Sequence, residues 1–122
     1  MKIERFEDLE VWQLARKLVN SIYTLTNDRN IVKDFGFTSQ IQRCAVSIMS
    51  NIAEGFERKS KKEFIHFLYI VKCSSGELRS QLYIAMDLAY INKKTFDENY
   101  KLIEMISKSL SGFIKYLQSS DV

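Results

Sequence analysis

The 122-residue sequence contains no proline and only four glycines, so very little in it interrupts a helix. Strand-rich chains carry turn residues at short, regular intervals, and that punctuation is missing here. Apolar residues make up 46% of the chain and charged residues 27%, which is the balance of a globular domain. The sequence therefore predicts an all-α fold with a single domain, residues 1–122.

Long apolar runs and metal-ligand clusters are also lacking. No run approaches the ~18 apolar residues of a membrane span, and the charged start of the chain has no secretory pattern, so we expect a cytoplasmic protein that contacts no membrane. The only cysteines are Cys44 and Cys73, without CxxC spacing, and the only histidine is His66. We expect no metal, no cofactor, and two reduced, mostly buried thiols.

Apolar residues recur at spacings of three and four along four segments, as on one face of a helix. With short turns between most of them, these segments predict an antiparallel, up-down-up-down four-helix bundle. We expect the helices at about 8–27, 38–56, 60–90 and 95–118, with residues 28–37 as the longest loop.

Capping residues support these boundaries. Asp8 is the expected N-cap of the first helix. Ser60 with Glu63, and Thr95 with Glu98, predict capping boxes that open the third and fourth helices.

The third predicted helix has more apolar surface than one bundle can bury. A second apolar set lies roughly opposite its core stripe, and a helix that is apolar on both sides is buried on both sides. Val46 and Ala53 likewise widen the apolar arc of the second predicted helix. We expect another copy of the chain to cover this surplus, with the oligomer interface at Ile65, Tyr69, Ile70, Cys73, Ile84 and Leu88.

Two glycines lie within or beside predicted helices. Gly55 marks the end of the second. Gly76 interrupts the third at its midpoint, where glycine costs ~1 kcal/mol relative to alanine. This indicates a close approach of another backbone or a bend, and simple tolerance of a weak helix former is the alternative.

Three segments together resemble a known family: FEDLEVW at 6–12, the run 35–70, and SSGELRSQLYIAMDLAY at 74–90. The most specific segment is SNIAEG at 50–55, followed by the Ser60 and Glu63 helix start. Over nearly the whole chain the sequence resembles the four-helix-bundle family, also called the 23S ribosomal RNA intervening-sequence protein family. One departure is Met49, where the family commonly has proline, which predicts a straighter second helix.

The resemblance implies a bundle that assembles as a ring, typically a pentamer, with a central channel. It also implies kinship to the accessory proteins of diversity-generating retroelements, whose basic ring engages a reverse transcriptase and nucleic acid. Expected partners are therefore further copies of the chain, with RNA, DNA or a reverse transcriptase as further candidates.

Candidate chemical residues are few. Asn51 and Glu54, which with Gly55 belong to the family motif, suit a binding pair, but such residues more often bridge or cap helices. A lone His66 without a paired nucleophile or carboxylate pattern does not indicate acid-base catalysis. We therefore expect no catalytic residue and no enzyme activity.

The lysines and arginines are distributed unevenly. Two groups are candidates for nucleic-acid binding: Arg58, Lys59, Lys61 and Lys62 at one turn, and Lys101, Lys108 and Lys115 at seven-residue spacing. The alternative is an ordinary solvated surface, because Glu57, Glu63 and Glu104 dilute the charge.

Three functions follow as hypotheses. The first is a self-assembling scaffold, a ring that engages a protein or ribonucleoprotein partner. The second is a direct, sequence-indifferent nucleic-acid binder that uses the basic groups. The third is a small-molecule enzyme or pocket protein, for which His66 or Glu54 is the strongest candidate residue.

Overall fold

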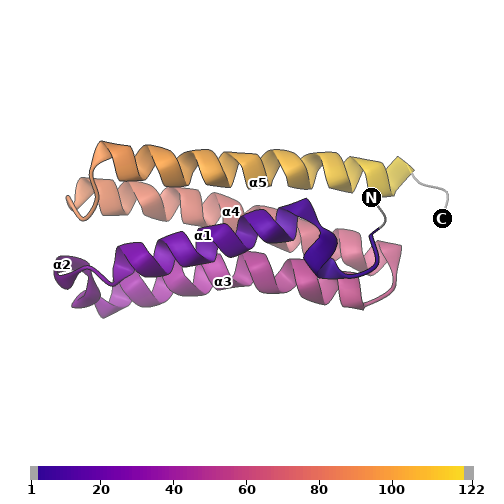
Figure 1. Ribbon diagram of the computed structural model, residues 1–122, viewed down its shortest axis with the longest axis horizontal. Helices are drawn as coiled ribbons and strands as arrows, with labels where there is room; N and C mark the ends of the chain where they lie inside the picture. The colour runs from indigo at the N-terminus through magenta and orange to yellow at the C-terminus, as the bar shows by residue number, and fades with distance from the viewer. Residues whose placement is uncertain (1–2, 120–122) are drawn as a thin grey trace.

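The computed structural model describes residues 3–119, and these residues form helices and no strands. The all-α prediction is confirmed. Four helices are long, and they lie side by side along the long axis of the molecule (Figure 1). The elements in chain order are the 3-10 turn η1 (Phe6–Asp8), α1 (Glu10–Thr26), α2 (Arg29–Val32), α3 (Phe35–Glu57), α4 (Lys61–Asp87) and α5 (Lys93–Ser119).

The long helices surround one apolar core. Both α1 and α4 pack against α3 and against α5. The α3–α4 connection lies at one end of the molecule, whereas α2 and the α4–α5 connection lie at the other (Figure 1). The predicted apolar stripes supply the core, whose largest fully buried side chains include Leu18, Ile22, Ile41, Ile48, Ile52, Leu68, Leu78, Leu82, Ile103, Ile106 and Leu110.

Of the three predicted N-cap residues, only Ser60 is confirmed. The Ser60 hydroxyl accepts a hydrogen bond from the Glu63 amide at 3.3 Å, and α4 begins at the next residue. The start at Thr95 is wrong, because the Asn92 side chain accepts from the Thr95 amide at 2.8 Å and α5 begins at Lys93. Asparagine is the stronger N-cap of the two.

The predicted N-cap Asp8 is also wrong. Its carboxylate accepts from the amides of Glu4 and Arg5, which closes η1. The N-cap of α1 is Leu9, whose side chain makes no capping hydrogen bond.

The predicted loop at 28–37 is mostly helical. The Asp28 carboxylate accepts from the Asn30 amide at 2.8 Å and caps the short helix α2. Asp34 accepts from the Phe37 amide at 3.1 Å and caps α3, which therefore begins at Phe35 and not near residue 38. Two aspartates that look like loop charges in the sequence are thus both helix caps.

The close approach of helices occurs at Gly55, within α3, and not at Gly76. A Cβ on Gly55 would lie 2.6 Å from Cβ of Phe67 and 3.0 Å from Phe64, so α3 and α4 touch there. Gly76 has no neighbour within 4 Å of the same position, and α4 continues through it. The prediction that another backbone approaches Gly76 is therefore wrong within a single chain. An approach by the backbone of a second copy stays a prediction.

Candidate assembly and nucleic-acid surfaces

The second apolar set of α4 divides into two groups. Ile65 packs against the core, and Tyr69 leans toward α5, where the Gln118 amide lies 3.5 Å from the Tyr69 hydroxyl. The other four members we call the α4 patch: Ile70 is half-buried, whereas Cys73, Ile84 and Leu88, the C-cap of α4, are exposed. Ile84 is 46% exposed and Leu88 is 52% exposed, although both are large and apolar.

The two thiols differ in environment. Cys73 is exposed, so the expectation that both cysteines are mostly buried is wrong for this one. Cys44 is buried and its Sγ donates to the Ser74 carbonyl at 3.1 Å. Burial, and then the nearby Glu77 carboxylate, raise the pKa of the Cys44 thiol to about 12, which leaves it protonated and unreactive at neutral pH.

A second exposed apolar group lies on α3. Val46 is 37% exposed, and Ala53 is half-buried. Phe35, the first residue of α3, is 79% exposed, although phenylalanine is normally well buried. We call these three residues the α3 patch. Phe35 was not predicted as an interface residue because it fell in the predicted loop. Asp34, directly before it, is a typical N-cap residue and could have indicated that the helix begins at Phe35.

Small polar side chains fill the seam between α3 and α4. The hydroxyls of Ser47 and Ser74 lie 3.3 Å apart, one from each helix. The Asn51 amide donates to the Ser47 carbonyl at 2.8 Å and to its hydroxyl at 3.0 Å. Paired polar groups of this kind fix the register of two helices.

The other two motif residues also have structural contacts. Glu54 pairs with Arg58 one turn later, at 3.1 Å. Gly55 lets α4 approach, as described above. Gly55 thus brings α3 against α4, whereas Asn51 bonds to Ser47 within α3 and Glu54 pairs with Arg58 at its C-cap.

The first basic group is partly neutralised. The Arg58 guanidinium pairs with Glu54 and, at 3.6 Å, with Glu63, and it lies over the Phe67 ring. Lys59 and Lys62 are exposed, whereas Lys61 is half-buried. The group therefore presents less free positive charge than its sequence indicates.

The second basic group lies along α5. Lys101, Lys108 and Lys115 are all exposed. Asp97 lies one turn before Lys101, and Glu104 lies between Lys101 and Lys108, while no carboxylate lies between Lys108 and Lys115. Such a surface attracts phosphate less strongly than an uninterrupted lysine ridge.

His66 is exposed on α4, with its ring edge-on to Phe67 at 6.0 Å between centroids. Across residues 3–119, no three His, Cys, Asp or Glu side chains are grouped so that they could hold a metal ion. Nor is any helix in that range long and apolar enough to cross a membrane.

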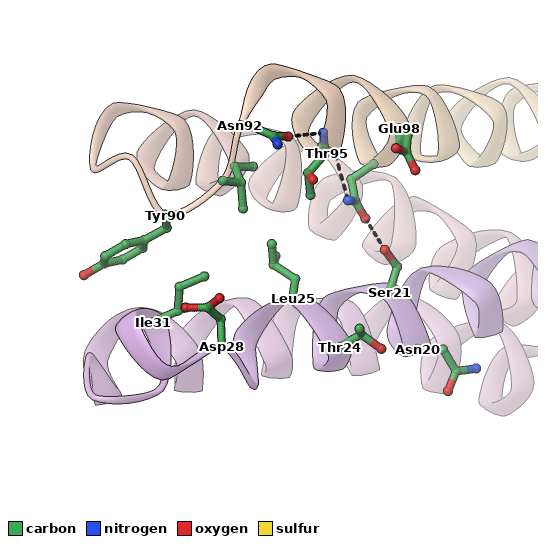
Figure 2. A pocket seen from close by; sticks show the side chains of 12 residues that line it. Asn20, Ser21, Thr24, Leu25, Asp28, Ile31, Tyr90, Asn92, Thr95 and Glu98 are labelled. Atoms are coloured by element: carbon green, nitrogen blue, oxygen red, sulfur yellow. Dashed lines mark hydrogen bonds between the residues drawn. The ribbon is translucent and has the colours of Figure 1, made fainter.

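A polar groove of about 530 Å³ lies between α1 and α5 near α2. Figure 2 shows Thr95 and Glu98 on α5 across the groove from Ser21 and Leu25 on α1. Asn99, only 3% exposed, accepts from the Ser21 hydroxyl at 2.7 Å and donates to the Thr95 carbonyl at 2.9 Å. Because both ends of this amide are used, the groove's buried polar group serves to hold α1 against α5.

The chain is similar in fold to a protein whose crystal structure is known. Its fold matches the crystal structure of a protein of unknown function from the S23 ribosomal protein family of Bacteroides thetaiotaomicron, with a TM-score of 0.79 and 25% sequence identity. The match covers 86% of this chain and 95% of that one. Among curated proteins, none matches the sequence. The family described as 23S rRNA-intervening sequence protein matches residues 7–112, and the chain belongs to that family.

Proposed function

We propose that this chain is a non-enzymatic, self-assembling scaffold protein of the cytoplasm, built as an up-down-up-down four-helix bundle. Copies of the chain form a ring, a homopentamer in the form that the family resemblance implies, and the ring engages a protein or ribonucleoprotein partner. The observation that carries this proposal is the exposed α4 patch, above all Ile84 and Leu88. Apolar surface of this kind on a helical face is typical of a protein interface.

The presence of two separate apolar patches favours a ring over a simple dimer. A two-fold dimer needs only one self-complementary patch, whereas a ring of more than two copies needs two different patches that fit each other. The two patches lie on different helices: Phe35 is the most exposed residue of the α3 patch, and Ile84 and Leu88 are the large exposed residues of the α4 patch. In the proposed ring, the α4 patch of one copy packs against the α3 patch of the next.

The first test is the mass of the purified protein in solution. Light scattering at micromolar concentration is expected to give a multiple of the single-chain mass. Changing both Ile84 and Leu88 to Lys is expected to give single chains with an unchanged helical circular dichroism spectrum, since both positions are about half exposed. A wild-type protein that runs as a single chain under these conditions contradicts the proposal.

A second test separates a ring from other assemblies. A variant with only the α4 patch disrupted, Ile84→Lys with Leu88→Lys, keeps the α3 patch. A variant with only the α3 patch disrupted, Phe35→Lys with Val46→Lys, keeps the α4 patch. Each alone is expected to be a single chain, and a mixture is expected to form one-to-one dimers and nothing larger. If the two variants do not associate when mixed, the proposal that the α4 patch packs against the α3 patch is refuted.

Direct binding of nucleic acid is the alternative function. It is favoured by the exposure of Lys59 and Lys62 at one end of the bundle and of the lysines along α5, because a ring repeats each surface several times. Two observations weigh against it: Arg58 is paired with two carboxylates, and Glu104 lies between two of the lysines of α5.

The salt dependence of affinity tests this alternative. If the protein binds RNA or DNA through these lysines, the affinity falls steeply with salt, and changing Arg58, Lys59, Lys61 and Lys62 to Ala flattens the dependence. The matched control changes Lys17 and Lys72, exposed lysines outside both groups. If the affinity for RNA or DNA is micromolar or weaker and is unchanged by the four alanine substitutions, direct nucleic-acid binding is refuted.

A further inference from the structure

An apolar groove lies at the end of the bundle where α3 turns into α4. It consists of two adjoining hollows of about 530 and 360 Å³, which share Ile3, Phe113 and Tyr116. The larger hollow is formed by residues of α3, α4 and α5, and the smaller one lies between the start of α1 and α5. We call the larger hollow the aromatic groove, lined by Ile3, Phe56, Lys59, Ser60, Lys61, Phe64, Phe113, Tyr116 and Leu117.

A ladder of aromatic rings forms the floor of the aromatic groove. Phe56 meets Phe64 edge-on at 5.8 Å between centroids, and Phe64 meets Phe113 edge-on at 5.4 Å. The Phe113 ring then stacks on Tyr116 at 6.4 Å. The rings come from three different helices and run from the buried Phe64 to Tyr116, which is 66% exposed. A site held by three helices is rigid before any ligand binds, which lowers the entropic cost of binding.

Within residues 3–119, the charged residues that line the aromatic groove are the lysines Lys59 and Lys61, and no carboxylate of that range lines it. The Lys59 ammonium lies 6.0 Å from the centre of the Phe56 ring, so positive charge stands directly beside the apolar floor. In the part of the chain that the structure describes, Glu10 is the one acidic residue lining the adjoining smaller hollow.

We propose that the aromatic groove binds a short segment of a partner protein in which a large apolar side chain stands beside acidic residues. The apolar side chain fills the hollow against Phe113 and Tyr116, and a carboxylate of the segment pairs with Lys59. This inference rests on the proposed scaffold function, because it names the chemistry by which the partner is held. An aromatic anchor in a preformed pocket with a charged rim is how compact protein interfaces obtain most of their binding energy.

The ring geometry favours a peptide over a nucleic acid here. Stacking of bases needs open ring faces, and of the rings in the ladder Tyr116 is exposed, whereas Phe64 is buried and Phe56 and Phe113 are half-buried. The neighbouring Arg58, the residue best suited to phosphate, is paired with two carboxylates. The groove therefore offers a pocket for one side chain and few free cations.

Fluorescence anisotropy with three matched peptides tests the proposal. The probe is a fluorescein-labelled peptide of sequence DEDFLDE, the charge control is KRKFLKR, and the apolar control is DEDSSDE. The probe is expected to bind in the micromolar range, and each control at least about tenfold more weakly. No binding of the probe below about 1 mM, or equal binding of the charge control, overturns the proposal.

Variants of exposed residues locate the binding. Tyr116→Ser and Lys59→Glu are each expected to weaken probe binding by about tenfold. The matched controls Tyr23→Ser and Lys108→Glu, which change exposed residues outside the groove, are expected to leave it unchanged. Equal effects of the groove variants and the controls would place the peptide elsewhere and overturn the assignment. So would displacement of the bound probe from the groove by a short single-stranded oligonucleotide that binds more tightly.

Light scattering on the same samples separates this inference from the proposed function. An assembled protein that does not bind the probe refutes the aromatic groove as a peptide site and leaves self-assembly standing. A single-chain protein that binds the probe through Tyr116 refutes the ring and leaves the groove standing.

Discussion

Gly55 shows how a single missing side chain can set the distance between two helices. All four glycines of the chain lie within residues 3–119, and at Gly55 alone a Cβ would have a neighbour closer than 3.4 Å. The nearest atoms belong to Phe64 and Phe67, which are themselves held in α4. Because Cβ of Phe67 is attached to backbone, it cannot swing aside as the end of a flexible side chain would.

Replacing Gly55 with alanine is therefore expected to destabilise the protein. The forced separation of α3 and α4 costs about 1–3 kcal/mol, which outweighs the ~1 kcal/mol that alanine contributes through helix propensity. The control Gly112→Ala, which meets nothing within 4 Å on α5, is expected to stabilise by ~1 kcal/mol. Urea unfolding of both variants measures the change in the free energy of unfolding, which is expected to be of opposite sign in the two. A Gly55→Ala protein more stable than wild type would contradict the close contact.

The two cysteines are expected to differ strongly in reactivity. At pH 8 a thiol whose pKa is about 12 is almost entirely protonated, and Cys44 is also buried. A Cys73→Ser variant, which retains only Cys44, should react with Ellman's reagent at least about a hundredfold more slowly than a Cys44→Ser variant in dilute solution. The difference should vanish in denaturant, and comparable rates in the native state would refute the buried environment of Cys44.

At the scale of the element, α3 and α4 are each followed, two residues after their last residue, by a residue with left-handed backbone. Lys59 has φ 58° and Ala89 has φ 59°, which are conformations that glycine adopts at little cost and other residues do not. After α4, the Tyr90 amide donates to the Ala85 carbonyl at 2.8 Å and the Ala89 amide donates to the Met86 carbonyl at 3.0 Å. These bonds satisfy the last carbonyls of the helix and hold Ala89 in its strained conformation.

Ala89→Gly is expected to stabilise the protein by about 1 kcal/mol, because it removes the clash of Cβ in this conformation. The control Ser80→Gly places glycine at an exposed position inside α4 and is expected to destabilise by about 0.5 kcal/mol. Thermal unfolding gives both values. A lower melting temperature for Ala89→Gly would mean that the helix end is not strained.

A hydrogen bond joins two connections at the α2 end of the molecule. The Tyr90 hydroxyl donates to the Asp34 carboxylate at 2.7 Å, so the segment after α4 is tied to the N-cap of α3. This bond, and then the Phe37 amide, lower the pKa of Asp34, while the bond to Asp34 raises the pKa of Tyr90.

The sign of the pH dependence follows from these directions. A lowered carboxyl pKa stabilises the fold above the carboxyl's ordinary pKa, and this contribution is lost as pH falls through the lowered value. A raised phenol pKa stabilises the fold below the ordinary phenol pKa and is lost at alkaline pH. The Tyr90→Phe variant is therefore expected to differ most from wild type in stability between these two limits, near neutral pH.

Carbon-detected NMR titration of Asp34 checks the cause directly. In Tyr90→Phe the pKa of Asp34 should rise toward its ordinary value, though not fully, because the Phe37 amide still donates to the carboxylate. An unchanged pKa would mean that the phenol does not contact the carboxylate in solution.

At the scale of the whole molecule, Gly76 distinguishes packing within a chain from packing between chains. Gly76 and Gly112 both have open space around them in the single chain, so Gly76→Ala and Gly112→Ala should stabilise the fold alike. If a second copy's backbone approaches α4 at Gly76, Gly76→Ala alone is expected to weaken assembly. Sedimentation of the two variants at matched concentrations tests this, and equal assembly would leave Gly76 as a merely tolerated weak helix former.

Local patterns determined much of this protein. The spacing of apolar residues predicted the four long helices and most of their buried faces, because helix periodicity is a property of neighbouring residues. The Ser60 start of α4 was likewise readable, since a cap and its partner lie three residues apart. The resemblance to the family was also visible in the sequence, most specifically in the motif at 50–55, and the family match over residues 7–112 confirms it.

Other features depend on contacts between residues far apart in the chain, and only the tertiary structure shows them. The sequence showed neither that Gly55 faces Phe67, nor that Cys73 is exposed while Cys44 is enclosed, nor that one end of the bundle collects rings from three helices. Helix periodicity states which face of each helix is apolar, but it leaves free how far each helix slides and turns against its neighbours. Those displacements are set by the fit of side chains across the core, and that fit determines which groups meet.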